Sequence, residues 1–403
     1  MDVDAFMPNE PGLLEALRFL TRPTMGQTVA RELPDVIPEV GLGPSAALEA
    51  LAPPVLFEAR DLSAPGFFAH MDPPTPWITW ATSMWTASRN QNLLHPDTAP
   101  AARELERRVV DWLAPFFGMG GGHLTPGSTI ANLTALWAAR QAGATEIVAS
   151  TSAHVSVRKA AHLLALPFRA IDDWGDPGDL GPAAAVLTAG TTATGEIEPL
   201  DAGRGARWRH VDAAWAGPLR LSERFAGLLA GIDAADSVAV SAHKWLFQPK
   251  ESALVLFADH DRAHASISVD GPYLAAPNVG VLGSHGAVAV PLLATLIAYG
   301  RSGIAAMIDR SMRLADELHD LVSSHDDLVA RSPPATGVVC WKHRSRDSTE
   351  IRAHLRDDVF VSQTTVDAET WLRSVAANPN AEPERIVAAV LAAAASIASD
   401  DAR

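Results

Sequence analysis

Two residues that could form a cofactor site close neighbouring apolar runs of this chain. The run 208–211 ends in Asp212, and the next apolar run, 237–242, is followed by His243 and Lys244. A lysine amine can form a Schiff base with an aldehyde, and a carboxylate can pair with a protonated ring nitrogen. Pyridoxal 5'-phosphate (PLP) carries both an aldehyde and such a ring, so this pair of residues predicts a PLP site.

Three further segments carry groups that suit the same cofactor. A Gly-rich turn, 120–127, leads into Ser128 and Thr129 at the start of an expected helix, where free backbone N–H groups and hydroxyls favour a phosphate. His154 opens a helix after an expected strand, and its imidazole could lie flat on a pyridine ring. Thr191 follows another strand in a turn bounded by two glycines. The Gly-rich segment is neither a Walker A loop nor a GxGxxG fingerprint.

Each of these features also has an ordinary structural explanation. Ser128 could cap a helix, Asp212 could do the same, and Lys244 could be a solvated loop residue. However, all of them fall at an expected strand end or helix start. In an α/β fold those positions meet at one edge of the sheet, where ligands bind. We therefore expect the groups to converge.

The elements that must position these groups alternate as in an α/β domain with a mainly parallel sheet. Small Ala214 after Asp212 leaves room for a flat ring. We expect strands at 146–150, 184–188, 208–212, 237–241 and 253–257, and helices at 101–117, 129–142, 155–165, 291–320 and 385–398. The chain divides into an N-terminal helical arm (1–60), a large PLP-binding domain (61–295) and a small C-terminal α/β domain (296–403).

The composition of the chain argues against several classes of binding partner. The chain has 403 residues, a net charge of -15 and one cysteine. This charge argues against nucleic acid or an anionic membrane surface as a partner, and one cysteine cannot form a cysteine metal cluster or a disulfide framework. The acidic N-terminus lacks a secretion signal, and no apolar run approaches the ~20 residues of a membrane span. We expect a cytoplasmic protein without a metal site.

The order of the motifs resembles that of the group II pyridoxal-dependent amino acid decarboxylases. The motifs are Gly-Ser-x-x-Ala-Asn, Ala-His-x-Ser-x-x-Lys-Ala, Gly-Thr-Thr-x-x-Gly, His-Val-Asp-Ala-Ala-Trp-Ala-Gly and His-Lys-Trp, within about residues 60–300. The resemblance implies the α/β fold type I of PLP enzymes, which is like that of aspartate aminotransferase. This fold has a mainly parallel seven-stranded sheet and a small C-terminal domain. The resemblance also implies a homodimer with shared active sites.

The resemblance also implies roles for individual residues in the α-decarboxylation of an L-amino acid. Lys244 forms the Schiff base, Asp212 pairs with the ring nitrogen, and His154 stacks on the ring. Tyr273 protonates the quinonoid left after carbon dioxide departs. The remaining cofactor-binding residues are Ser128, Thr129, Thr191, Ala214, His243 and, from the neighbouring subunit, Ser284; the substrate-binding residues are His70, Pro73, Trp77 and Arg373.

Two departures from the family pattern keep other reactions open. The segment from Tyr273 to Gly286 is short, and His285 stands where compact members usually carry arginine. An aminotransferase, an aldolase or a desulfurase on the same fold is the alternative, and a non-enzymatic scaffold is a third. A hydrolase or a zincin is unsupported, because the chain has neither a GxSxG nor an HExxH motif.

The side chain of the substrate remains open at this stage. Tryptophans at 77, 80 and 85 in a Pro-rich segment favour an aromatic or hydrophobic L-amino acid. Arg89, His70 and His95 would instead suit an acidic side chain. Diaminobutyrate, aspartate and glutamate all remain candidates.

Overall fold

The computed structural model describes residues 7–21 and 33–401 and divides the chain into two compact units, Met1–Asp61 and Leu62–Arg403. The first unit holds α1 (Glu10–Thr21), α2 (Pro44–Ala52) and a π-helical turn (Pro53–Phe57). These helical pieces lie in the segment for which an N-terminal helical arm is expected. The four leucines of α1 at positions 13, 14, 17 and 20 are exposed. The limits of the three expected domains remain predictions.

The second unit is built on a seven-stranded sheet. Its strand order is β1-β7-β6-β5-β4-β2-β3, and only β7 runs antiparallel to its neighbours. The fold predicted from the sequence, a mainly parallel seven-stranded sheet, is confirmed. The strands are β1 (Gly121–Thr125), β2 (Glu146–Ser150), β3 (Phe168–Ile171), β4 (Ala183–Thr188), β5 (Trp208–Asp212), β6 (Ser237–Ser241) and β7 (Ala253–Phe257).

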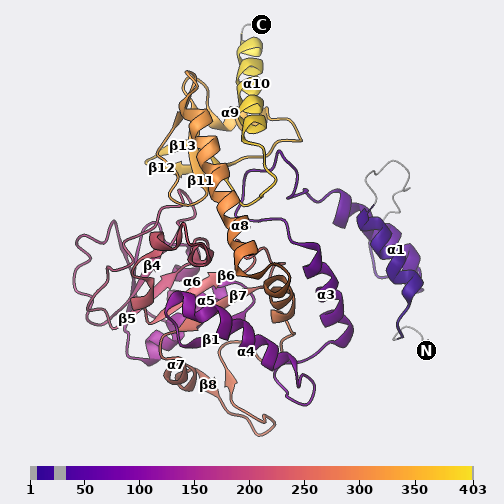
Figure 1. Cartoon of the computed structure of the whole chain (residues 1–403), viewed down its shortest axis with the longest axis vertical. Coiled ribbons are helices and arrows are strands. Elements are labelled where there is room, and N and C mark those ends of the chain that lie inside the picture. Colours follow the sequence, from indigo (N-terminus) through magenta and orange to yellow (C-terminus); the bar gives the residue numbers. More distant parts are fainter. Residues whose placement is uncertain (1–6, 22–32, 402–403) are drawn as a thin grey trace. The chain divides into compact units, whose positions relative to one another are not determined.

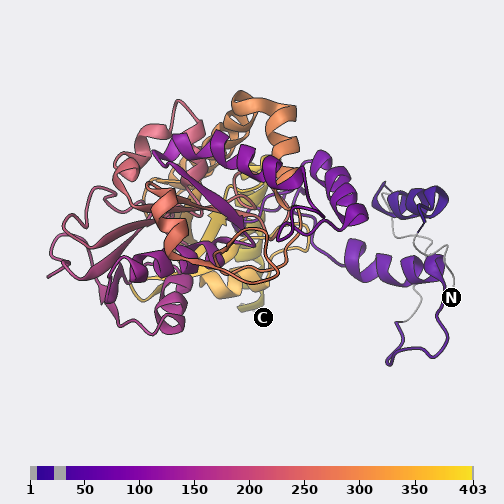
Figure 2. The same ribbon diagram turned by 90° about the horizontal axis from the view of Figure 1, so that it is seen from below.

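Helices cover both faces of this sheet (Figures 1 and 2). Successive strand residues alternate between the two faces, so Ile147 and Ala149 pack on one side and Val148 on the other. The first side is covered by α5 (Ser128–Gln141), α6 (Val155–Leu163) and α7 (His260–Ser266). The second is covered by α4 (Ala102–Leu113), α8 (Ala289–Ser323) and the 3₁₀ turns Ala114–Phe117, Gly217–Leu221, Ala226–Leu229 and Ile232–Ala234.

Strand β1 corrects the expectation that residues 120–127 form a Gly-rich turn. Residues Gly121–Thr125 pair with β7 along their whole length, and the turn is confined to the two residues that follow. The glycines allow a close approach between strands, because a Cβ on Gly122 would lie 2.0 Å from the carbonyl oxygen of Val255. Gly127, with a φ of +107°, then reverses the chain into α5.

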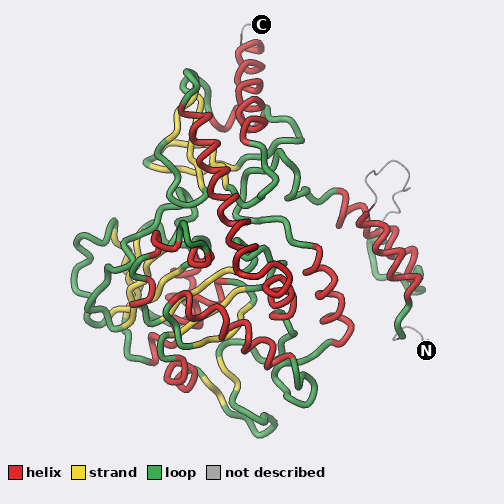
Figure 3. The backbone as a smooth tube through the Cα atoms, viewed as in Figure 1, coloured by secondary structure: helices red, strands yellow, loops and turns green. Residues whose placement is uncertain are grey.

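A second, four-stranded antiparallel sheet lies in the C-terminal part, in the order β10-β11-β13-β12. Its apolar face packs against the second half of α8 and the last helix (Figure 3). Gly300, with a φ of +63°, kinks α8 between its two halves. The elements are β10 (Leu328–Ala330), β11 (Val338–His343), β12 (Ser362–Val366), β13 (Glu369–Val375), α9 (Ser348–Ala353) and α10 (Pro383–Asp401).

Helix α8 departs from the expectation that no segment could span a membrane. By length and composition alone, this helix is long and apolar enough to cross a membrane, because its most apolar 18 residues have a mean hydropathy of 1.4. Its buried residues, among them Leu292, Ile304 and Leu318, belong to the two cores of the second unit. This pattern is that of a core helix, and the helix links the two sheets.

Candidate active site

The carboxyl edge of the large sheet gathers the residues expected to bind the cofactor ring. Asp212 is the last residue of β5, and Lys244 follows β6, which runs parallel to β5. His154 is the N-cap of α6, after β2. The charges of Asp212 and Lys244 both act on the His154 ring, so the three side chains face one region. Parallel strands end at the same edge, which explains the convergence.

Asp212 is a buried carboxylate with fixed partners. Its side chain is almost fully buried, and Oδ1 accepts a hydrogen bond from the backbone N–H of Ala214 at 3.1 Å. Oδ2 accepts from the amide of Asn132 at 2.8 Å. Both oxygens of Asp212 thus act as hydrogen-bond acceptors with fixed positions. A carboxylate fixed in this way can also accept a hydrogen bond from a protonated ring nitrogen.

Asn132 connects Asp212 to His154. Its Nδ2 also donates to Ser156 Oγ at 2.9 Å, and Ser156 Oγ lies 2.8 Å from His154 Nδ1. The backbone N–H of Ser156 donates to the same ring nitrogen at 3.2 Å. His154 Nδ1 is therefore an acceptor, and burial lowers the pKa of His154, so the neutral ring carries its proton on Nε2.

The network continues into the core on the other side of Asn132. His210 Nε2 lies 2.9 Å from Asn132 Oδ1, and His210 Nδ1 lies 2.9 Å from Ser237 Oγ, which also accepts from Trp208 Nε1. Burial lowers the pKa of His210 to about 4, so the ring is neutral at pH 7. Ser237 then donates to Nδ1, and Nε2 donates to Asn132. Every group in this buried chain has a partner.

Lys244 as a whole residue is half-buried and lies at the edge of this network. Burial lowers the pKa of Lys244, while the carboxylates of Asp212 and Asp72 oppose that shift and the charges of Lys250 and Arg373 support it. A lowered pKa increases the neutral amine, which is the form that attacks an aldehyde. The environment of Lys244 therefore suits the role expected for it.

The start of α5 provides groups for a phosphate. Ser128 Oγ accepts a hydrogen bond from Ser241 Oγ at 2.8 Å, and Thr129 beside it is exposed. The His243 ring lies over the turn, because a Cβ on Gly127 would be 3.6 Å from its Cε1. Burial lowers the pKa of His243 to about 4, and its Nδ1 donates to the carbonyl of Ser252. Free N–H groups, a hydroxyl and an imidazole thus meet at one helix start.

The other residues expected around the cofactor lie differently. The Thr191 hydroxyl closes its own turn, with Thr194 Oγ1 at 2.9 Å and the N–H of Glu196 at 3.2 Å. Ser284 is exposed and accepts a hydrogen bond from Asn92 at 3.1 Å. Ala214 is buried beside Asp212. For Thr191 and Ser284, a cofactor contact stays a prediction.

Tyr273, the expected proton donor, is exposed on the surface of the described chain. It occupies the turn between two-residue strands β8 (Ser268–Val269) and β9 (Asn278–Val279), and it is 72% exposed. Its ring centroid lies 6.5 Å from that of His95. Among the described residues, no hydrogen bond or ring contact joins Tyr273 to Lys244, and the ring contact of Tyr273 is with His95.

The expected substrate residues divide into buried and exposed members. Arg373, on β13, is buried and donates to the carbonyl of Thr192 at 2.8 Å, to the carbonyl of Ala69 at 3.3 Å and to Ser362 Oγ at 3.2 Å. His70 packs its ring against that of Phe360, at 5.6 Å. Pro73 is buried, whereas Trp77 at the start of α3 (Trp77–Arg89) is 65% exposed.

Sequence reasoning missed two residues of this site. Asn132 links Asp212 to His154, and its signal was its place at the end of the Gly-Ser-x-x-Ala-Asn motif, one helical turn after Ser128, although no role was predicted for it. Asp72 acts on the charge of Lys244 and forms an ion pair with Lys250. Its signal was its position in the Pro-rich segment that also carries Trp77.

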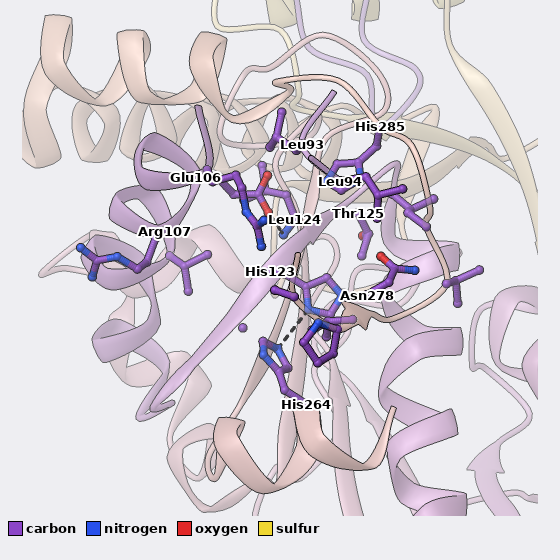
Figure 4. Close-up of a pocket in the computed structure, with 18 of the residues that line it drawn as sticks. Leu93, Leu94, Glu106, Arg107, His123, Leu124, Thr125, His264, Asn278 and His285 are labelled. Atoms are coloured by element: carbon purple, nitrogen blue, oxygen red, sulfur yellow. Dashed lines mark hydrogen bonds between the residues drawn. The ribbon is translucent and has the colours of Figure 1, made fainter. Parts of the chain in front are cut away.

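A separate cavity of about 380 Å³ lies beside β1 and does not include Lys244, Asp212 or His154. His123 and His264 face each other inside it, with Nδ1 and Nε2 3.1 Å apart, and Glu106 and His285 lie on its other walls (Figure 4). In residues 7–21 and 33–401, no three His, Cys, Asp or Glu side chains are arranged to hold a metal ion.

The residues present at the sheet edge fit PLP. The carboxylate of Asp212 is fixed by two hydrogen bonds, burial lowers the pKa of the Lys244 amine, and hydroxyl and backbone donors meet at the start of α5. In addition, the buried Thr188 Oγ1, opposite Asp212 on β4, has no hydrogen-bond partner among the described residues. A buried hydroxyl without a partner at a sheet edge suits a bound polar ligand.

Comparisons with known proteins agree with this geometry. Residues 55–344 match the pyridoxal-dependent decarboxylase conserved domain. The L-2,4-diaminobutyrate decarboxylase of Rhizobium meliloti is 28% identical over 87% of this chain and 81% of its own length. The aspartate 1-decarboxylase of Aliivibrio fischeri is 28% identical over 73% and 66%, respectively. The crystal structure of mouse CSAD shares the fold, with a TM-score of 0.83 and 20% identity over 98% of this chain and 99% of that one.

Proposed function

Because this chain belongs to the pyridoxal-dependent decarboxylase family, whose members are PLP-dependent amino acid carboxy-lyases, we propose that it removes the α-carboxyl group of an L-amino acid with Lys244 as the residue that holds PLP. The product is the corresponding amine and carbon dioxide. One observation carries the assignment of Lys244. It stands at the sheet edge beside Asp212, whose carboxylate is fixed by two hydrogen bonds.

The chain's own residues would hold the cofactor at both ends. Asp212 would pair with the ring nitrogen, and the neutral His154, oriented by Ser156, would lie on the ring. Ser128, Thr129 and His243 would receive the phosphate. When bound, PLP supplies an electron-accepting ring that stabilises the electron pair left when a bond to Cα breaks.

Arg373 would orient the substrate by its carboxylate. Its guanidinium is buried, and its hydrogen bonds in the described chain go to two carbonyls and one hydroxyl rather than to an acid. A buried cation of this kind favours an anionic ligand. The charge of Arg373 also acts on Lys244, so a carboxylate held there lies near the covalent link.

Tyr273 would supply the proton that completes the reaction. The bond from Cα to the carboxylate breaks, carbon dioxide leaves without the bonding electrons, and a proton must be added at Cα. Tyr273 is exposed on the β8–β9 hairpin, so it would serve an active site only after closure of the hairpin or across a subunit boundary. We propose a homodimer with shared sites, to which the partner contributes Ser284, and a cytoplasmic location.

The substrate is not decided by the relatives. The two named above act on diaminobutyrate and aspartate, whose side chains carry opposite charges. The test is an assay of the purified, PLP-loaded protein against a panel of L-amino acids, with carbon dioxide and amine both measured. Lys244→Ala is the control. Amine and carbon dioxide in equal amounts support the proposal, whereas a keto acid or an aldol product without carbon dioxide would favour the alternative reactions.

A further inference from the structure

We propose that Asp72 selects the substrate by binding a cationic side chain, so that the enzyme acts on L-amino acids whose side chains end in an amine. This inference rests on the proposed decarboxylation and adds the class of substrate. The starting observation is that Asp72 forms an ion pair with Lys250, 178 residues away, in the loop that follows Lys244.

Asp72 belongs to a segment that is hydrogen-bonded to the small sheet beside the buried Arg373. The N–H of Phe68 donates to the carbonyl of Phe360, and Ser362 Oγ and Arg373 both donate to the carbonyl of Ala69. Asp72 comes three residues later, at most about 11 Å further along an extended chain. The expected binding group for the α-carboxylate and the carboxylate of Asp72 therefore flank one short stretch of backbone.

Asp72 lies close enough to the site residues for its charge to act on several of them. Its carboxylate acts on Lys244, His70, His243 and Arg373. Burial lowers the pKa of both histidines, that of His243 to about 4, so neither ring neutralises Asp72 at pH 7. Lys250 is the cation paired with it.

The pairing with Lys250 is weak and replaceable. The Lys250 side chain is 62% exposed and that of Asp72 is 38% exposed. Ion pairs in solvent contribute little to stability, because water screens them and the lysine loses side-chain freedom. A substrate ammonium can therefore take the place of Lys250 at little cost.

Asp72 is the better organised member of the pair. It stands between buried Met71 and buried Pro73, and its short side chain has few rotamers to lose. Lys250 has a long flexible stem that reaches into solvent. Because the fixed group determines specificity, the pair favours a cationic side chain over an acidic one.

The first experiment compares kcat and KM of the PLP-loaded enzyme for three groups of L-amino acids. These are 2,4-diaminobutyrate and ornithine, their neutral counterparts 2-aminobutyrate and norvaline, and the acids aspartate and glutamate. We expect kcat/KM for the diamino acids to exceed that for the neutral counterparts at least tenfold. Asp72→Asn should raise KM for the diamino acids at least tenfold, with a smaller change in kcat, and remove the preference.

Two variants sharpen this experiment. Asp111→Asn is the matched control, because it removes the same charge from another solvent-facing ion pair, with Arg107. It should keep the preference. Lys250→Met removes the competing cation and should lower KM for the diamino acids. Binding is measured separately, as competitive inhibition by 1,3-diaminopropane against propylamine, and Asp72→Asn should weaken only the diamine.

A readout independent of catalysis tests whether Asp72 faces Lys244. The rate at which the cofactor-free protein takes up PLP should rise with pH as the Lys244 amine loses its proton. Asp212 and Asp72 stabilise the charged amine, while Lys250 and Arg373 destabilise it. Asp72→Asn should therefore shift the midpoint to lower pH, and Asp111→Asn should not. An unchanged midpoint in Asp72→Asn would overturn the placement of Asp72.

The outcomes separate this inference from the proposed function. Carbon dioxide released from aromatic or acidic amino acids in preference to diamino acids would overturn the role of Asp72 and leave the decarboxylation standing. Activity on acidic substrates that disappears in Lys250→Met would assign specificity to the lysine instead. A PLP-loaded protein that releases no carbon dioxide from any amino acid would overturn both.

Discussion

The cofactor end of the site and the Tyr273 hairpin differ in how firmly the single chain holds them. Asp212, Asn132, His210 and His154 form one buried hydrogen-bonded chain on the large sheet. Tyr273 stands on a hairpin with two-residue strands and is 72% exposed. A preorganised charge binds a cofactor ring without rearrangement, whereas a proton donor must reach Cα only after substrate has entered. The site thus has a fixed half, which contains Asp212, Asn132, His210 and His154. Its other half, which carries Tyr273, must be brought in to the bound substrate.

The largest effect should come from breaking the fixed half at Asp212→Ala. Removing one partner of a buried ion pair costs about 3–5 kcal/mol, and each ~1.4 kcal/mol is a tenfold effect, so amine formation should fall at least ~100-fold. The measurement is the initial rate of carbon dioxide release at saturating PLP. A melting curve of the cofactor-free variant separates loss of function from loss of folding. A rate within a few-fold of the unmodified enzyme would remove Asp212 from the mechanism.

Tyr273→Phe tests the half that must be brought in. Amine production should fall by about 100-fold, the usual contribution of a positioned general acid. Carbonyl by-products that consume oxygen should rise, and cofactor binding should persist. Tyr299→Phe is the matched control, because the chain has only two tyrosines and Tyr299 lies in α8. Full amine output from Tyr273→Phe would show that another group donates the proton.

Asn132→Ala tests whether the buried network holds Asp212 in place. It removes one donor from a buried carboxylate, which costs about 1–3 kcal/mol, so PLP affinity should fall about tenfold. Thr134→Ala, on the same helix, removes a hydroxyl that donates to Ile130 in its own helix and serves as the control. Equilibrium titration with PLP is the measurement. Equal affinities in the two variants would contradict the role of Asn132.

The smallest effect should come from Gly280→Ala, beneath the Tyr273 hairpin. Gly280 has a φ of +76°, and a Cβ there would lie 2.9 Å from His123 Nε2. The substitution should displace the hairpin and lower amine output a few-fold, without changing PLP affinity. Gly286→Ala, where a Cβ meets no atom within 4 Å, is the control. Lower PLP affinity in Gly280→Ala would show that the hairpin supports the fixed half too.

The same contrast explains what could be predicted from the sequence. Asp212 and Lys244 could be predicted because a charged residue after a buried apolar run marks the end of a strand. Parallel strands end at the same edge of a sheet, so the two residues were expected to lie together. Strand β1 was taken for a turn because its glycines signal flexibility, although they serve close packing against β7. Asn132 and Asp72 were missed because their partners lie 80 and 178 residues away, so only the tertiary fold reveals them.

The central claim is that the amine of Lys244 holds the cofactor, and one measurement tests it most directly. The PLP-loaded protein is reduced with borohydride, digested, and its peptides are mapped by mass spectrometry. The account predicts a stable phosphopyridoxyl group on Lys244 and none on Lys250, six residues further along the chain. A folded, PLP-loaded protein in which Lys244 stays unmodified would contradict it.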